Sequence, residues 1–147
     1  MAGEKGNNNS IGWLEMILQA VQSADMIGLV RNDTAPLTVL YVSLHTADPT
    51  AAGTQSSSEA AYSGYARVAV ARSSAGWSIS GETVSNAAAI TFPSSTSGPE
   101  SETWFGVGTA ASGAGVLLWA GPLSAPLVVN SGITPSFAIG ALQITEG

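Results

Sequence analysis

The only histidine of the sequence, His45, has the clearest potential for acid–base chemistry, and Asp48 follows it three residues later. With one of the many serines, the two could form a Ser-His-Asp arrangement, in which the histidine takes the proton of an attacking hydroxyl. The sequence lacks the Gly-x-Ser-x-Gly motif that presents such a serine on a sharp turn. A histidine at the end of a predicted strand is better explained by a structural hydrogen bond, so we expect no catalytic residue and no enzyme.

Metal and cofactor sites lack the residues that they need. The chain has no cysteine and one histidine, so carboxylates are the remaining strong ligands. Glu100 and Glu102 form a close acidic pair, but the Asp-x-Asp-x-Asp-Gly pattern of a calcium loop is missing. Gly113-Ala-Gly115 lies between apparent strands and is not followed by the glycine and helix of a phosphate-binding loop. The sequence therefore predicts neither a metal nor a cofactor.

Length and charge limit the kind of protein and its partners. The 147 residues predict one domain. Lys and Arg number 4 against 10 Asp and Glu, a net charge of -6, which argues against nucleic acid as a partner. No secretory signal and no apolar run long enough to cross a bilayer is found, so we expect a protein that is soluble in the cytoplasm where it is made. Only 10% of the residues are charged, which predicts that much of the surface is covered in an assembly.

Three segments are expected along the chain. Residues 1–9 are polar and rich in Asn and Gly, which predicts a flexible arm. Residues 10–35 are expected to hold a docking helix over 11–23, capped by Ser10, and a linker. Residues 36–147 are expected to form a β-sandwich domain.

The predicted helix carries apolar residues at helical spacing on one face. An isolated helix of this length is marginally stable in water, so this face must dock on the domain or on a second subunit. Trp13 is expected to reach a neighbouring subunit, because tryptophan is enriched among interface anchors, whereas Trp77, Trp104 and Trp119 are expected to pack in the core. The predicted interface residues of the helix are Trp13, Leu14, Ile17, Leu18 and Val21.

Beyond the helix the sequence is typical of many short strands separated by Ser, Gly, Asn and Pro. This pattern predicts a mainly β fold, an antiparallel β-sandwich of jelly-roll type with one N-terminal amphipathic helix. The predicted strands are 37–44, 65–72, 77–80, 83–85, 87–92, 104–109, 116–121, 127–129 and 137–145.

Two stretches with little patterning, 50–63 and 94–103, are predicted to be long surface loops. Loops of this length in a compact domain are usually functional or disordered, so they are expected to contact partners. Glu100 and Glu102 lie in the second loop and are included among the predicted interface residues.

Several segments together resemble a family of small structural proteins from tailed bacteriophages, often labelled tail fibre proteins. The segments that carry the resemblance are Leu40-Tyr-Val-Ser-Leu-His-Thr-Ala-Asp-Pro49, Gly64-Tyr-Ala-Arg-Val-Ala-Val70, Asn86-Ala-Ala-Ala-Ile-Thr-Phe-Pro93, Trp104-Phe-Gly-Val-Gly108, Ser131-Gly-Ile-Thr-Pro-Ser-Phe137 and Ala141-Leu-Gln-Ile-Thr-Glu146. The resemblance implies a virion component without catalytic residues, similar to the jelly-roll cement proteins that sit as trimers on phage capsids.

Two functions follow from this resemblance and from the composition. The first, which we favour, is a capsid decoration or cement protein. It is expected to form a homotrimer on the capsid surface, to bind the major capsid protein and to stabilise the head. The second is a tail- or fibre-associated protein whose loops 50–63 and 94–103 meet a host receptor. Both hypotheses place the protein in the virion, after a stay in the host cytoplasm, with no contact to nucleic acid or membrane.

Overall fold

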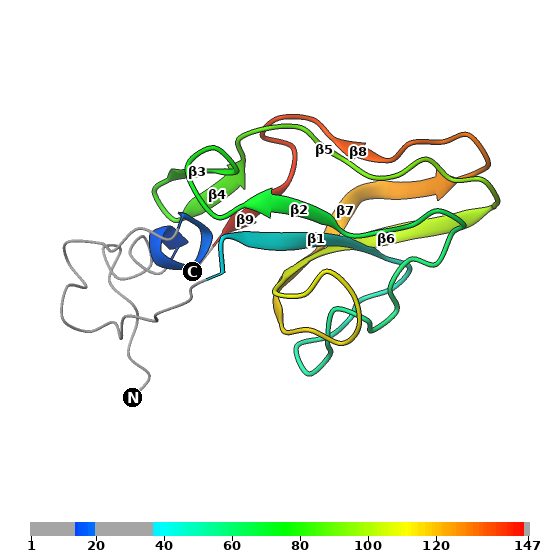
Figure 1. Cartoon of the computed structure of the whole chain (residues 1–147), viewed down its shortest axis with the longest axis horizontal. Helices are drawn as coiled ribbons and strands as arrows, with labels where there is room; N and C mark the ends of the chain where they lie inside the picture. The colour runs from blue at the N-terminus through cyan, green and yellow to red at the C-terminus, as the bar shows by residue number, and fades with distance from the viewer. Residues whose placement is uncertain (1–13, 20–36, 146–147) are drawn as a thin grey trace. The chain divides into compact units, whose positions relative to one another are not determined.

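The computed structural model describes residues 14–19 and 37–145 of the chain (Figure 1). The chain divides into two compact units. Of the described residues, the first unit holds 14–19, 37–38, 71–89 and 138–145, and the second holds 39–70 and 90–137. The predicted arm over residues 1–9 and both predicted segment boundaries lie outside the described residues.

The second unit is built on a four-stranded sheet with the strand order β2-β1-β6-β7. In this sheet β1 pairs antiparallel with β6, and β6 pairs antiparallel with β7, which is an edge strand. A further antiparallel pair, β5 with β8, belongs to the same unit. The strands are β1 (Val39–His45), β2 (Val68–Ala71), β5 (Ile90–Thr91), β6 (Glu100–Gly108), β7 (Leu117–Val129) and β8 (Ser136–Phe137).

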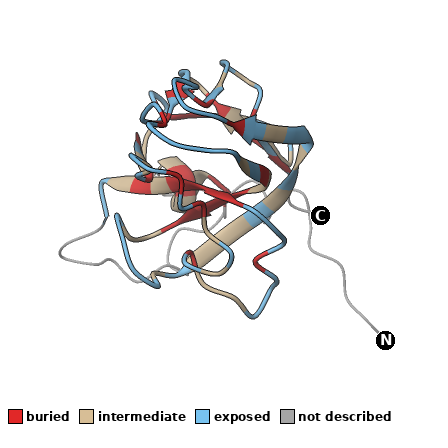
Figure 2. Cartoon of the chain, turned by 90° about the vertical axis from the view of Figure 1, so that its right-hand side faces the viewer, coloured by how far each residue is buried: buried red, intermediate tan, exposed pale blue. Residues whose placement is uncertain are grey.

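The core of the second unit lies between the four-stranded sheet and the β5–β8 pair. Leu40, Val42 and Leu44 alternate along β1 and are at most 2% exposed (burial is coloured in Figure 2). Ser43 and His45, on the opposite face of the strand, are also fully buried, so the second half of β1 is covered on both faces. The rings of Phe105 on β6 and Phe137 on β8 meet edge to face, with centroids 6.2 Å apart. These contacts produce a sandwich-like arrangement.

The first unit contains a three-stranded antiparallel sheet and a short helical turn. The turn, η1 (Glu15–Gln19), is π-helical, and Leu18 within it is buried. The sheet has the order β3-β4-β9, with β3 (Trp77–Ser80), β4 (Thr83–Asn86) and β9 (Gln143–Thr145). Trp77 and Val84 are fully buried in this unit.

The mainly β fold of antiparallel sheets with little helix is confirmed. The predicted helix over 11–23 can be compared only at residues 14–19, because the rest lies outside the described part of the chain. No helical segment among residues 14–19 and 37–145 is long and apolar enough to cross a membrane.

Three details of the strand prediction were wrong. Residues 100–103, assigned to a loop, begin β6. The predicted strands 116–121 and 127–129 form the single strand β7, which contains Pro122 and Pro126 between them; an edge strand tolerates prolines because positions that lack an N–H can face its unpaired side. The predicted strand 137–145 is divided between β8 and β9, with Gly140 between them at a φ of 74°.

Candidate functional site

Three loops of the second unit meet at residues 61–64, 94–99 and 130–133, here termed the loop cluster. The Thr96 N–H donates to the Ser63 carbonyl at 3.0 Å, and the Thr96 hydroxyl donates to the Ser63 hydroxyl at 2.8 Å. The Ser63 N–H donates to the Ser97 hydroxyl at 3.3 Å. The structure therefore brings together parts of the two loops that were predicted to contact partners.

The third loop is tied to the second by backbone hydrogen bonds. The Ser95 N–H donates to the Ile133 carbonyl at 2.9 Å, and the Gly132 N–H donates to the Ser95 carbonyl at 2.7 Å. Ser95 itself is buried, and its hydroxyl donates to the Ser97 carbonyl. Several hydrogen bonds to main-chain groups thus join the loops, and they limit the movement of the loops.

Two glycines allow these loops to approach closely. Gly64 has a φ of 98°, and a Cβ atom on it would lie 2.8 Å from the Ser94 carbonyl oxygen. A Cβ atom on Gly98 would lie 2.6 Å from the Val129 carbonyl oxygen. Any larger residue would push the loops apart, because Cβ atoms do not approach other atoms so closely.

A carboxylate at the start of β6 anchors the first loop of the cluster. One oxygen of Glu100 accepts from the Ala61 N–H at 2.6 Å and from the Tyr62 N–H at 3.2 Å. Tyr62 is buried below the cluster, and its hydroxyl donates to the Pro93 carbonyl at 3.1 Å. Burial, together with the nearby carboxyls of Glu102 and Glu100, raises the pKa of Tyr62 to about 12.

Glu102 lies beside this anchor in an unusual state for a carboxyl. It is fully buried, and no donor of the described residues contacts either of its oxygens. Burial raises the pKa of Glu102 to about 8, and the charge of the nearby Glu100 carboxyl adds to the rise.

The outward surface of the loop cluster is neutral and polar. Its exposed residues are Ala61, Ser63, Gly64, Ser94, Thr96, Ser97, Gly98, Pro99, Asn130, Ser131, Gly132 and Ile133. Hydroxyls, one amide and free main-chain groups of this kind can hydrogen-bond an uncharged partner but supply no acid, base or nucleophile of altered reactivity. The cluster is therefore suited to recognition.

A buried ion pair holds the base of the loop over residues 46–64. Arg67 donates from Nε to Oε1 of Glu59 at 2.6 Å and from Nη2 to Oε2 of Glu59 at 2.7 Å. The same guanidinium donates to the carbonyls of Ala110 and Gly113 at 2.8 and 2.6 Å. The Tyr65 hydroxyl donates to Glu59 at 3.0 Å, and burial raises the pKa of Tyr65. This network joins the loop after β1 to the loop after β6.

His45 is a structural residue in this network. It is fully buried, its Nδ1 lies 2.8 Å from the Ser57 carbonyl, and its Nε2 lies 2.8 Å from the Ser43 hydroxyl. A carbonyl can only accept, so Nδ1 carries the proton and Nε2 accepts from Ser43. Burial lowers the pKa of His45. Asp48 instead accepts from the Thr50 N–H at 2.8 Å, so the possible Ser-His-Asp arrangement is absent at these residues.

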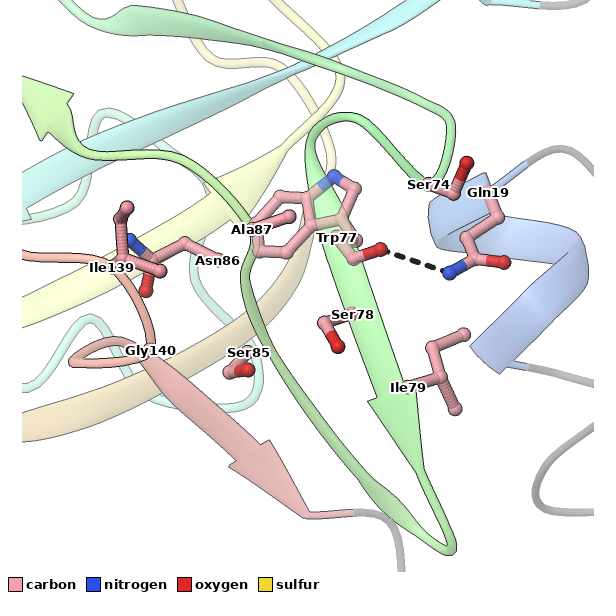
Figure 3. A pocket seen from close by; sticks show the side chains of 10 residues that line it. All are labelled: Gln19, Ser74, Trp77, Ser78, Ile79, Ser85, Asn86, Ala87, Ile139 and Gly140. Carbon is pink, nitrogen blue, oxygen red and sulfur yellow. Dashed lines mark hydrogen bonds between the residues drawn. The ribbon is translucent and has the colours of Figure 1, made fainter.

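The first unit contains a separate hollow of about 450 Å³ (Figure 3). Gln19, Trp77 and Ile79 are among the residues that line it, and the Gln19 amide donates to the Trp77 carbonyl at 2.9 Å. Trp77 is fully buried, and its indole N–H has no partner among the described residues. Asn86, also in the lining, is occupied by bonds to the Ala88 and Ala138 carbonyls at 2.8 Å. The hollow offers no ionisable group.

No group of three or more His, Asp or Glu residues within the described ranges could hold a metal ion. The candidate site of the second unit is therefore the polar surface of the loop cluster, which is supported by the hydrogen bonds described above.

The comparison with protein families is decisive for identity. Residues 19–145 match the model of the family described as podophage GP4 fiber I protein gp80. The chain belongs to this family. No curated protein matches the chain.

Membership of the fiber I family confirms the resemblance to phage structural proteins labelled as tail fibre proteins. The chain is a structural protein of the phage virion, of the fibre type that the family description names. Of the two functions considered from the sequence, the description favours the fibre-associated alternative over capsid decoration.

The predicted interface residues of the fiber I chain lie in two places. Leu14 and Leu18 are fully buried and Ile17 is partly buried, whereas Trp13 and Val21 lie outside the described residues. Glu100 is partly buried at the foot of the loop cluster and Glu102 is fully buried. These two carboxyls lie together, as their spacing suggested, but on a strand. Their role in an interface stays a prediction.

Sequence reasoning missed the supporting residues of the site. Glu59, Arg67 and Gln55 carry most of the side-chain bonds below the loops, and Gln55 is fully buried. Gln55 accepts from the Ala110 N–H at 2.9 Å. Arg67 offered a local signal, because a cation within an otherwise apolar alternating strand needs a buried acceptor. Gln55 offered none, since its partners are distant in sequence.

Proposed function

We propose that the chain is a tail- or fibre-associated virion protein that contributes to host receptor binding through the loop cluster, without a catalytic step. The observation that carries the proposal is the match of residues 19–145 to a fiber protein family. A fibre is the part of a virion that extends from the particle, so its exposed loops are the first to meet a host surface.

The geometry of the loop cluster supports this role. Its loops are exposed, yet they are bonded to one another and fastened to β6 through Glu100. A surface that is ordered before binding loses little conformational entropy when it binds. The cluster itself contains no charged residue, so a neutral receptor rich in hydroxyl groups, such as an uncharged host glycan, suits it best.

The proposal is tested by competition. The purified chain is added to host cells, and the rate at which phage then adsorb is measured. We expect the wild-type chain to slow adsorption. The Ser131→Arg variant is expected to need a concentration about tenfold higher or more for the same slowing, because the new side chain covers the exposed cluster. Ser131 makes no side-chain bond within the described residues, so the fold is expected to persist.

Ser112→Arg is the matched control. Ser112 is also exposed, lies in the loop between β6 and β7 outside the cluster, and the substitution adds the same charge. We expect it to compete as the wild type does. Equal competition by both variants, or no competition by wild-type chain, would count against the loop cluster as a receptor site.

A second measurement tests the position in the virion. Antibody-gold labelling of intact particles is expected to mark the tail or its fibres. Labels spread over the head would overturn the proposal and support the decoration of the major capsid protein instead.

A further inference from the structure

A long part of the sequence is without charge. Residues 103–145 contain no Asp, Glu, Lys, Arg or His. Within the second unit this run forms most of β6 and all of β7 and β8. Soluble protein surfaces usually carry about 25–35% charged residues, so exposed surface built from this run is suited to contact with another protein.

The exposed surface of this run is concentrated on β7. The strand is 13 residues long, and only its last residue, Val129, is buried. Val128 is 51% exposed, and Val116, just before the strand, is 59% exposed. Leu117, Leu118 and Trp119 are only partly buried, although residues of these types normally lie inside.

Among the strands of the described residues, β7 is also the unpaired edge of its sheet. Natural proteins protect such edges with charged side chains, prolines, bulges or a covering segment. β7 has Pro122 and Pro126 and irregular pairing opposite β6 between them, but no charge. The stretch Trp119–Gly121 pairs regularly with β6, at Val107, Gly106 and Phe105, and its other side pairs with no strand of the described residues.

We propose that β7 is a contact surface between copies of this chain. The charge of the chain favours a second copy as the occupant. Each copy carries a net charge of -6, so two copies repel one another wherever their acidic residues meet. The uncharged β7 side is a surface on which two copies approach without that repulsion, and an apolar edge is complementary to itself in a symmetric contact.

The size of the surface sets the expected strength. A strand of 13 residues is about 43 Å long and covers about 430 Å² at a width of about 10 Å. A stable interface covers about 800 Å² per partner. β7 supplies about half of this area, and Val116, which directly precedes the strand and is 59% exposed, extends it. The association is therefore expected to depend on concentration.

The test uses the purified full chain and its oligomeric state in sedimentation equilibrium over about 1 to 300 μM. We expect wild-type chain to associate, and to do so more strongly at higher salt, because salt screens the repulsion between acidic copies. Ala120→Lys, at an exposed position of β7, is expected to weaken association at least about tenfold. Val128→Lys tests the same surface at the other end of the strand.

Ala69→Lys is the matched control. Ala69 is exposed on β2, the opposite edge strand of the same sheet, and the substitution changes the net charge equally. We expect Ala69→Lys to associate as wild type does, with circular dichroism showing that each variant is folded. A wild-type chain that stays monomeric throughout, association unchanged by both β7 variants, or equal loss in the control would overturn the proposal. None of these outcomes depends on receptor binding.

Discussion

The buried carboxyl of Glu102 leads to a prediction about stability against pH. Its pKa is raised to about 8 from an ordinary value of 4.5, because it is buried without donors and lies beside Glu100. The folded chain therefore holds a proton that the unfolded chain releases. The stabilisation from this group is complete below pH 4.5 and is lost as the pH rises to about 8. The whole shift corresponds to about 5 kcal/mol at most.

Glu102→Gln removes the titration and keeps the shape. The amide cannot ionise and has nearly the same shape as a protonated carboxyl, so it imitates the protonated state. Near pH 5 we expect the variant and the wild type to have similar free energies of unfolding. Toward pH 9 we expect the variant to become the more stable by several kcal/mol, within the limit of about 5 kcal/mol.

Urea unfolding followed by tryptophan fluorescence, repeated from about pH 5 to about pH 9, measures this difference. Glu82→Gln, on the partly exposed turn between β3 and β4, is the control for the change in net charge and should leave the pH dependence unaltered. If wild type and Glu102→Gln keep a constant difference across this range, Glu102 does not hold its proton in the folded chain and the reasoning fails.

Three further predictions concern the residues below the loops. Gly106→Ala would place a Cβ 2.6 Å from His45 Nε2 and 2.7 Å from Ser43 Oγ, so we expect urea unfolding to show a loss of about 1–3 kcal/mol; an unchanged midpoint would contradict this packing. Burial lowers the pKa of His45, so its contribution to stability is present above pH 6.5 and is lost as the pH falls; His45→Gln should remove this acid sensitivity in the same assay. In Arg67→Lys, the lysine cannot form both the paired bond to the Glu59 carboxylate and the two bonds to main-chain carbonyls, so limited proteolysis within residues 109–116 should become faster. Equal cleavage rates in the variant and the wild type would refute the role of the guanidinium.

The sequence was sufficient to predict those elements whose own residue pattern determines their structure. The residues of β1 are mostly apolar, with the β-branched and aromatic types that favour strands, and the helical turn at residues 14–19 falls within a segment of helical spacing. The two loops predicted to contact partners were identified by their lack of pattern, and parts of both meet in the loop cluster. Local composition is informative where the residue types within one element determine its structure.

The sequence was insufficient where distant residues decide the environment. Glu100 and Glu102 lie in a Ser-rich stretch typical of a solvated loop, but pairing of residues 100–102 with residues 127–129 of β7 makes this stretch the start of β6. In the same way, two prolines separate apparent strands at 116–121 and 127–129, while pairing with β6 continues on both sides of them. The spacing of the carboxyls was visible, whereas their burial was not.

The two proposed surfaces support each other if both hold. Neutral hydrogen bonds of the kind that the loop cluster offers contribute about 0.5–1.5 kcal/mol each, so one cluster would hold a host glycan only weakly. Copies joined along β7 would repeat the cluster in one assembly, and simultaneous contacts can raise the apparent affinity by about 100-fold or more without any new bond. A variant that loses association through Ala120→Lys should therefore also compete less well for adsorption, although its loop cluster is intact. Ser131→Arg should show the converse, with association kept and competition lost.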